Sequence, residues 1–158
     1  IASFCLGLLA VGVLSMPVLA KEVGPGETVL IQDMELTVPE GFELLQDAKD
    51  NGKIILGFKG ISADEYLTIY VSDQMGMDMR EVFVNGGSQV VNDIRNMPRN
   101  TYNWSVLETK KSHPGNNRMY YMTSFLVEHD GYTYYGFTRT ESGSRSNSIV
   151  NDFLTALR

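Results

Sequence analysis

Hydrophobic and polar residues alternate along the first half of the chain in short segments that end at turn residues. The segments cover residues 28–31, 34–38, 42–46, 53–59 and 66–72. Segments of this length with this alternation predict β-strands. Asn51-Gly52 lies between two of them and supplies the positive φ angles that a tight hairpin turn requires. We therefore expect this half of the chain to form an antiparallel meander.

From Asp78 the spacing of apolar residues changes. They recur at steps of three and four up to Pro98, at Met79, Phe83, Gly86, Val90, Ile94 and Met97. This spacing predicts an amphipathic helix from Asp78 to Met97. The pair Gly86-Gly87 costs a helix about 1 kcal/mol per glycine relative to alanine, which we explain by close approach of the helix backbone to the sheet. A break into two short helices at these glycines is the alternative.

Alternating segments return after Pro98, and they are rich in aromatic residues. They cover residues 103–110, 118–128 and 132–139. Asp130-Gly131 predicts a two-residue turn between the last two. If His129 pairs with Tyr132 across it, both faces of the sheet carry apolar side chains. One face has Met119, Tyr121, Phe125, Val127, Tyr132 and Tyr134, and the other has Tyr120, Met122, Leu126, Tyr135 and Phe137.

A sheet that is apolar on both faces needs cover on both faces. A second amphipathic helix is predicted from Asn147 to Leu157, with Ser144 or Ser146 as its N-cap. The sequence therefore predicts an α+β fold: an antiparallel β-sheet with one helix on each face, an α/β/α sandwich. If both helices shared one face, the other face would be an exposed interaction surface.

The first twenty residues have a different pattern. Residues 1–14 are almost entirely apolar, Pro17 interrupts the run, and Val18 and Ala20 stand before the charged pair Lys21-Glu22. A short apolar core followed by small residues is typical of a signal peptide and its cleavage site. An uncleaved anchor is the alternative, although the run is short for a membrane-spanning helix. We expect residues 1–20 to be a signal peptide, residues 21–26 a flexible start, and residues 27–158 a single α/β domain.

Charge and cysteine content narrow the classes of function. The chain has 13 basic and 19 acidic residues, all of them after Ala20, and a formal net charge of −6. An acidic surface repels phosphate backbones, so we expect no nucleic-acid partner, and no stable membrane insertion once the signal is cleaved. The single cysteine, Cys5, lies in the predicted signal peptide. The remaining chain therefore offers no disulfide, no cysteine-based zinc site and no cysteine nucleophile.

Several segments together resemble the PsbP-like family, which includes exported bacterial proteins of the DcrB type. The resemblance rests on residues 34–42 (MELTVPEGF), the strands at 53–59 and 66–72, the central helix, and the closing helix at 149–157. It implies an α/β/α sandwich around an antiparallel sheet. Members of the family serve mainly as binding or accessory proteins, and the resemblance brings no catalytic residues with it.

Motifs for a nucleophile, a phosphate-binding loop or a dinucleotide are not found in the sequence, so no catalytic residue, cofactor or metal site is predicted. His113 and His129 both stand at turns. The distinctive residues are aromatic, and we name Trp104, Tyr132 and Tyr134 as the exposed binding set. Because tyrosine and tryptophan also form strands readily, a purely structural role is the alternative.

The sequence thus predicts an exported, non-enzymatic binding or accessory domain, periplasmic or secreted, of a bacterium. Its partner is expected to be a protein or a component of the cell envelope. Two alternatives stay open: a hydrolase of an envelope polymer that uses carboxylates brought together by the fold, and a structural component of an exported assembly.

Overall fold

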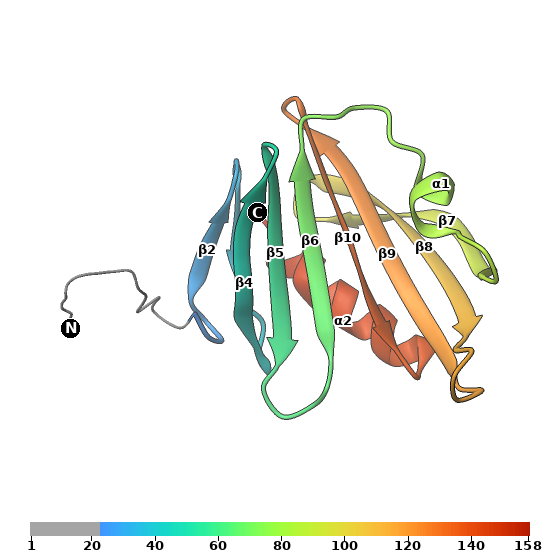
Figure 1. Cartoon of the computed structure of the whole chain (residues 1–158). Coiled ribbons are helices and arrows are strands. Elements are labelled where there is room, and N and C mark those ends of the chain that lie inside the picture. The colour runs from blue at the N-terminus through green and yellow to red at the C-terminus, as the bar shows by residue number, and fades with distance from the viewer. Residues whose placement is uncertain (1–22) are drawn as a thin grey trace.

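A computed structural model describes residues 23–158, and the predicted signal peptide lies outside this part of the chain (Figure 1). The elements are β2 (Thr28–Ile31), β3 (Met34–Thr37), β4 (Phe42–Asp50), β5 (Lys53–Gly60), β6 (Tyr66–Ser72), α1 (Met79–Phe83), β7 (Gln89–Arg99), β8 (Tyr102–Ser112), β9 (Met119–His129), β10 (Tyr132–Thr140) and α2 (Gly143–Ala156). None of the described helices is long and apolar enough to cross a membrane.

Seven strands form one sheet in the order β4-β5-β6-β10-β9-β8-β7. The sheet consists of two meanders, one from β4 to β6 and one from β7 to β10, and they join where β10 pairs with β6. The chain reaches the far edge through the segment that carries α1, then returns strand by strand to the middle (Figure 1). All pairings in the sheet are antiparallel, as the sequence predicts.

Both predicted hairpin turns are confirmed. Asn51 and Gly52 have φ angles of 51° and 79°, and Asp130 and Gly131 have 55° and 81°. Asparagine, aspartate and glycine tolerate this left-handed region, which a two-residue turn of this kind requires at both positions. His129 pairs with Tyr132, so the assignment of side chains to the two faces of β9 and β10 is also confirmed.

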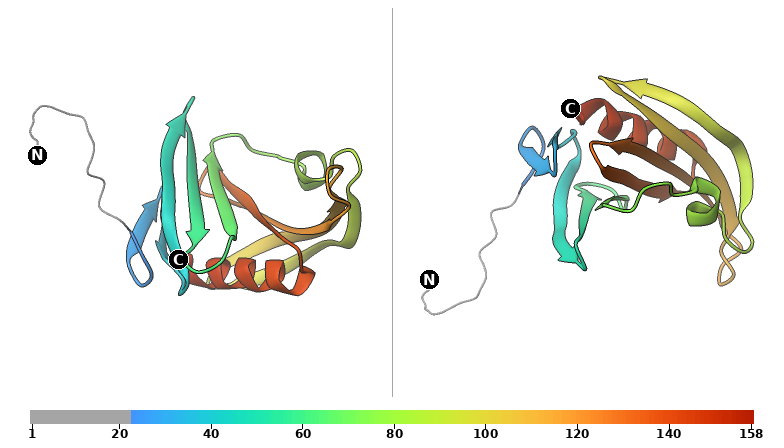
Figure 2. Two further views of the ribbon diagram at one scale, coloured as in Figure 1. Left: turned by 60° about the horizontal axis from the view of Figure 1, so that its bottom comes forward. Right: turned by 90° about the horizontal axis from the view of Figure 1, so that it is seen from above.

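The helix α2 covers one face of the sheet (Figure 2). It buries Ile149, Val150, Phe153 and Leu154 in the main core. Ser142 is its N-cap, and the Ser142 Oγ accepts a hydrogen bond from the Arg145 backbone N–H at 3.3 Å. The helix therefore begins earlier than the predicted Asn147, and the predicted caps lie inside it. Its first turn is polar and carries no apolar signal from which the true start could be read.

The predicted long helix from Asp78 to Met97 is wrong. Only Met79–Phe83 is helical, with Asp78 as its N-cap, and residues 89–99 form the edge strand β7. The alternative of two short helices is also not what the structure has. Gly87 has a φ of 86° in the turn before β7, and a Cβ at Gly86 would meet nothing within 4 Å. These glycines therefore serve a turn and not a close approach to the sheet.

The irregular pairing of β7 explains why its sequence looks helical. Its register against β8 shifts between Val90 and Asn92 and again between Asn92 and Arg95. Each bulge adds a residue and changes the face to which the following side chains point. Apolar residues of a strand with such shifts recur at steps of three and four, which is also the helical spacing.

The prediction of one helix per face is consequently not confirmed. On the face opposite α2, the single turn of α1 places Met79 and Phe83 against Leu107, Leu126 and Tyr135. The segment that was expected to complete this cover belongs to the sheet itself. The fold is a mostly antiparallel β-sheet with two helices, and much of the face on the α1 side has no helix above it (Figure 2).

The two ends of the described chain meet beside the sheet. Glu35 of β3 exchanges two backbone hydrogen bonds with Arg158, at 2.8 and 2.9 Å. The Gly26 N–H donates to the Val38 carbonyl at 2.9 Å, and the Leu44 N–H donates to the Val23 carbonyl at 2.8 Å. Backbone contacts with the domain therefore begin before residue 27, within the segment that was expected to be a flexible start.

Candidate functional site

The three aromatic residues named from the sequence do not form an exposed set. Trp104 and Tyr134 are fully buried, with 0 % of each residue exposed, in the same core cluster as the apolar residues of α2. Tyr132 is half-buried against that cluster. The prediction of their exposure is wrong for the first two, because their side chains lie on the face of the sheet that α2 covers.

The contacts of these two residues are those of a core. Trp104 packs edge-on against Phe125, with 5.7 Å between ring centroids. The Tyr134 hydroxyl accepts a hydrogen bond from the Asp33 backbone N–H at 3.1 Å and so ties the hairpin of β2 and β3 to the sheet. Burial raises the pKa of Tyr134. Their role is structural, which is the alternative that strand propensity offered.

The open face on the α1 side carries three adjoining hollows, which we call the α1-side groove. Their volumes are about 380, 110 and 370 Å³. Arg139 lines all three, Asn85 and Met122 join the first to the second, and Lys111 and Tyr120 join the second to the third. The three hollows therefore adjoin one another, and their lining residues extend from β5 and β6, past α1, to the turn between β8 and β9.

The first hollow has an aromatic floor. Tyr70 of β6 and Tyr135 of β10 stack, with 5.1 Å between centroids and an angle of 23° between the ring planes. Phe83 of α1 contacts Phe137 of β10 edge-on at 6.3 Å. Rings held at these separations attract each other and form a rigid apolar surface. This end of the groove can receive an apolar or aromatic group.

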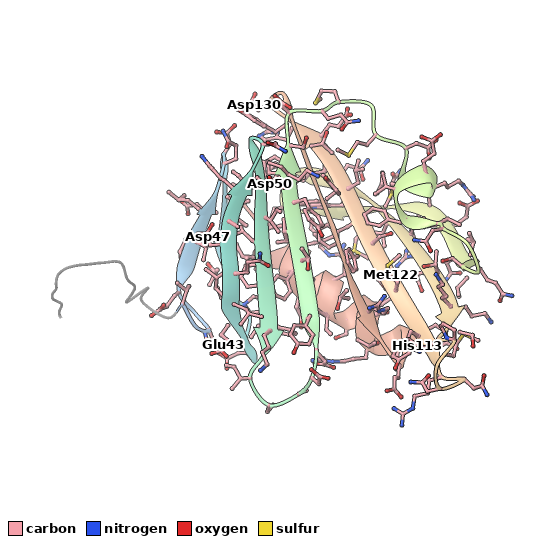
Figure 3. All side chains as sticks on the ribbon, in the orientation of Figure 1. Glu43, Asp47, Asp50, His113, Met122 and Asp130 are labelled. Atoms are coloured by element: carbon pink, nitrogen blue, oxygen red, sulfur yellow. The ribbon has the colours of Figure 1, made fainter. Side chains whose placement is uncertain are left out.

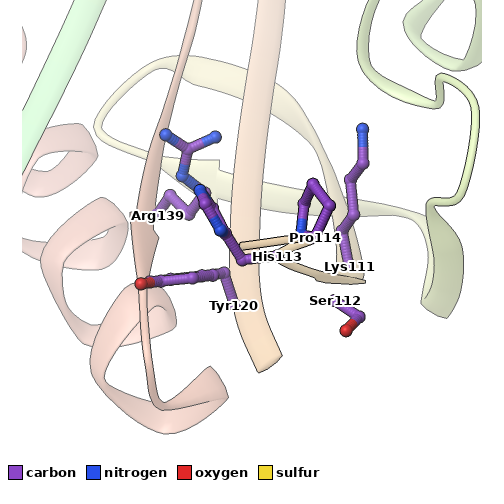
Figure 4. A pocket seen from close by; sticks show the side chains of 6 residues that line it. All are labelled: Lys111, Ser112, His113, Pro114, Tyr120 and Arg139. Carbon is purple, nitrogen blue, oxygen red and sulfur yellow. The ribbon is translucent and has the colours of Figure 1, made fainter. Parts of the chain in front are cut away.

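The third hollow is polar, and Figure 4 shows its six lining side chains: Lys111, Ser112, His113, Pro114, Tyr120 and Arg139. The His113 Nδ1 accepts a hydrogen bond from the Gly115 backbone N–H at 3.1 Å. In the neutral ring the proton is therefore assigned to Nε2, which is a donor. Arginine and lysine only donate, and serine and tyrosine hydroxyls can donate. This end of the groove can bind an oxyanion.

The groove carries positive charge that is not paired with a carboxylate of the described residues. Arg139 has no ion pair or hydrogen bond with any described residue, whereas Arg80, Arg95, Arg118 and Arg145 are each paired with a carboxylate. Lys111 donates only to the amide oxygen of Asn85, at 3.3 Å. The Lys53 ammonium stands 5.7 Å from the centre of the Tyr70 ring, where a cation is attracted to the π-face.

No acidic side chain lines any of the three hollows in the described part of the chain. The chain has 19 acidic and 13 basic residues, so its net charge is negative. The charged side chains of the groove are all basic, so the local charge is opposite in sign to the net charge. Glu43, Asp47 and Asp50 lie along the edge strand β4, whereas His113 lies in the turn after β8, near the opposite edge of the sheet (Figure 3). Positive charge in a concave site concentrates anions there.

Sequence reasoning missed the groove for one reason. Tyr120, Met122, Tyr135 and Phe137 are correctly assigned to one face by alternation, and Arg139 continues that face. The face was expected to lie under a long helix, and that helix does not exist. A period-two series that passes from tyrosine and phenylalanine to arginine was the available signal for an amphipathic groove.

Two other places carry titratable groups. A hollow of about 620 Å³ beside the end of α2 is lined by Glu40, Asp152 and Arg158, among others. Glu65 accepts two hydrogen bonds from Arg145, at 2.8 and 2.7 Å, and this guanidinium lowers the pKa of Glu65. Among residues 23–158, no group of three or more His, Cys, Asp and Glu side chains is placed to hold a metal ion.

Comparison with known proteins gives similarity to solved structures. No family model matches the sequence, and no curated protein matches it. Among solved structures, the chain is similar to the solution structure of cyanobacterial PsbP (CyanoP) from Synechocystis, with a TM-score of 0.58 and 14 % sequence identity. The similarity covers 84 % of this chain and 91 % of that one. The protein therefore has a PsbP-like fold, as the sequence resemblance implied.

Proposed function

We propose that this protein is a non-enzymatic binding domain and that the α1-side groove holds its partner. The observation that carries the proposal is the composition of the groove: lysine, arginine, histidine and aromatic side chains and no carboxylate, in an acidic chain. An aromatic floor beside positive charge fits a partner that presents apolar and anionic groups together.

We further propose that the domain acts outside the cytoplasm, in the cell envelope or the secreted fraction of a bacterium. The support is the pattern of residues 1–20 and the restriction of the single cysteine to that segment. A PsbP-like fold is compatible with such a role but does not determine it.

Hydrolysis of an envelope polymer is the alternative that the sequence leaves open. It would require two carboxylates over one cleft. Glu40 and Asp152 line the hollow beside α2, but both are exposed, whereas a general acid commonly works from a site with little water. The groove itself offers donors and no carboxylate, so binding is the function that we propose. A structural role in an exported assembly would use the same surface.

A photo-crosslinking residue placed in the groove tests the proposal in the producing cells. Met122 is suitable because it is half-buried and lines two of the hollows. Leu45 on β4 provides the control position, since it is 61 % exposed and lies outside the groove. We expect a discrete crosslinked product from position 122 and none from position 45.

A charge-reversal substitution in the groove is the second part of this test. The substitution Arg139→Glu reverses an exposed charge that has no ion pair or hydrogen bond within residues 23–158, so it should leave the fold intact. We expect Arg139→Glu to remove the crosslink at position 122. Lys49 is an exposed lysine on β4, and we expect Lys49→Glu to leave the crosslink in place. Equal crosslinking from positions 45 and 122, or a product that survives Arg139→Glu, would refute the proposed site.

A further inference from the structure

We infer that the occupant of the α1-side groove is an extended acidic peptide segment in which an apolar side chain and a carboxylate are two residues apart. This inference rests on the proposed function and specifies the partner of that site. Its basis is the order of side chains along β10, where Phe137 lines the first hollow, which we call the apolar hollow, and Arg139, two residues on, lines both this hollow and the third, the oxyanion hollow.

The spacing of the two hollows follows from strand geometry. Phe137 and Arg139 are separated by one residue and point to the same face of β10. Alternate residues of a strand are about 6.8 Å apart. An extended peptide that lies along the groove has the same spacing between its own alternate side chains. A residue pair at positions i and i+2 can therefore fill both hollows at once.

The oxyanion hollow matches a carboxylate in charge and in donors. The Arg139 guanidinium can present two parallel N–H groups to one carboxylate. Tyr120 and Ser112 add hydroxyl donors at the wall, and Lys111 adds a second positive charge. In Figure 4 the His113 ring lies beside Arg139 and Tyr120, and its Nε2–H is free of the turn hydrogen bond that Nδ1 makes.

The first hollow can receive an apolar side chain beside its two positive charges. Phe83, Phe137, Val82 and Met122 line it together with Lys53 and Arg139. Val82 is 41 % exposed, so its burial by an apolar group of a ligand would be favourable. Lys53 adds to the positive potential of the groove.

The shape of the site favours a peptide over a membrane. Phe137 is half-buried whereas Arg139 is exposed, so a flat lipid surface would reach Arg139 before it reached Phe137. Phosphate-rich polymers would satisfy the positive charge but would leave the apolar hollow empty. Lipid vesicles and a phosphate polymer are therefore both tested as competitors in the experiment.

The test measures binding of a fluorescent peptide to the purified protein by fluorescence polarisation. The peptide is a flexible Gly/Ser chain that carries one Phe and one Glu at positions i and i+2. Two control peptides have the same composition with Phe and Glu at i and i+3, or have Lys in place of Glu. Anionic phospholipid vesicles and polyphosphate are added in separate competitions.

We expect the i, i+2 peptide to bind about tenfold more tightly than either control, because each control loses one of the two contacts. Arg139→Glu should weaken binding by about tenfold or more, and so should Val82→Glu, which places a repelling charge at the apolar hollow. Lys49→Glu and Leu30→Glu are the matched controls. Lys49 is exposed and Leu30 is 72 % exposed, both outside the groove, and we expect no change from either.

Equal affinity for the i, i+2 and i, i+3 peptides would overturn the inference, and so would tighter binding of vesicles or polyphosphate than of peptide. The crosslinking experiment separates this failure from failure of the proposed function. If the crosslink at position 122 requires Arg139 while no peptide binds, the groove is a binding site for another class of partner. If neither result appears, both proposals fail.

Discussion

Glu65 and Arg145 form a two-pronged ion pair between the segment before β6 and the first turn of α2. A positive side chain in the first turn of a helix opposes the helix dipole. The carboxylate of Glu65 offsets this effect, and Arg145 in turn lowers the pKa of Glu65. At this position the two charges link the start of α2 to the edge of β6.

The pair should make stability depend on pH in a defined direction. The pKa of Glu65 is lowered in the fold. The contribution of the ion pair to the free energy of unfolding is therefore complete above the ordinary glutamate pKa of about 4.3, and it disappears as the pH falls through the lowered pKa. We expect Glu65→Gln to lower the free energy of unfolding at pH 7 by less than about 1 kcal/mol. Urea denaturation at several pH values measures this difference, which should approach zero in strong acid.

Glu40→Gln is the matched control, since Glu40 is exposed and has no ion pair with a described residue. We expect no effect from it at any pH in the series. A Glu65→Gln difference that stayed constant from pH 7 into strong acid would contradict the assignment of this pair.

Trp104 and Arg139 show that residue type alone does not predict which residues line a binding surface. Tryptophan is typical of binding surfaces, yet Trp104 is enclosed in the core and its Nε1 has no hydrogen-bond partner among residues 23–158. Arg139 drew no attention in the sequence, yet it joins all three hollows. Alternation along a strand predicts which residues share a face. It does not predict which face a helix will cover, because that depends on elements distant in sequence.

At the scale of elements, the turns and most strands were predictable, and the edge strand β7 was not. Asn51-Gly52 and Asp130-Gly131 determine their turns through local backbone preference alone. The shape of β7 depends on where its bulges fall against β8, which no local pattern contains. The β-branched residues Val90, Val91 and Ile94 were the available sign of a strand.

Gly136 in the middle of β10 has no room for a side chain. A Cβ at this position would overlap the Thr68 carbonyl oxygen of β6 and lie 2.7 Å from the Phe125 Cζ. We expect Gly136→Ala to lower the free energy of unfolding by about 3 kcal/mol or more, because a central strand cannot move away from both neighbours. Urea denaturation followed by circular dichroism measures the loss.

Gly86→Ala is the matched control for this substitution. Gly86 lies in open space and is not in the left-handed region. Alanine there should be neutral or stabilise by up to about 1 kcal/mol, since it restricts the unfolded chain. Similar losses from Gly86→Ala and Gly136→Ala would contradict the close packing of β10 on β6.

At the scale of the whole molecule, the sheet depends on a strand from the last part of the chain. Between them, β10 and α2 supply the middle of the sheet and the cover of one face. Without them, β6 and β9 each lose a partner. The two meanders would then have no hydrogen-bonded connection.

A chain that ends at residue 131 should therefore lack a cooperative unfolding transition. The single tryptophan, Trp104, reports the outcome, because its indole is buried by contacts that include the missing parts. We expect water-exposed fluorescence from the truncated chain, and a shift to the emission of a buried indole when a peptide of residues 132–158 is added. A cooperative transition in the truncated chain alone would contradict this interdependence.

The late position of β10 also bears on the order of events during synthesis. The strand that pairs with one side of β6 is absent until the ribosome has made β10, so the two meanders cannot join before that point. If the protein is exported, as we propose, this order of synthesis would favour passage of the unfolded chain through a translocation channel.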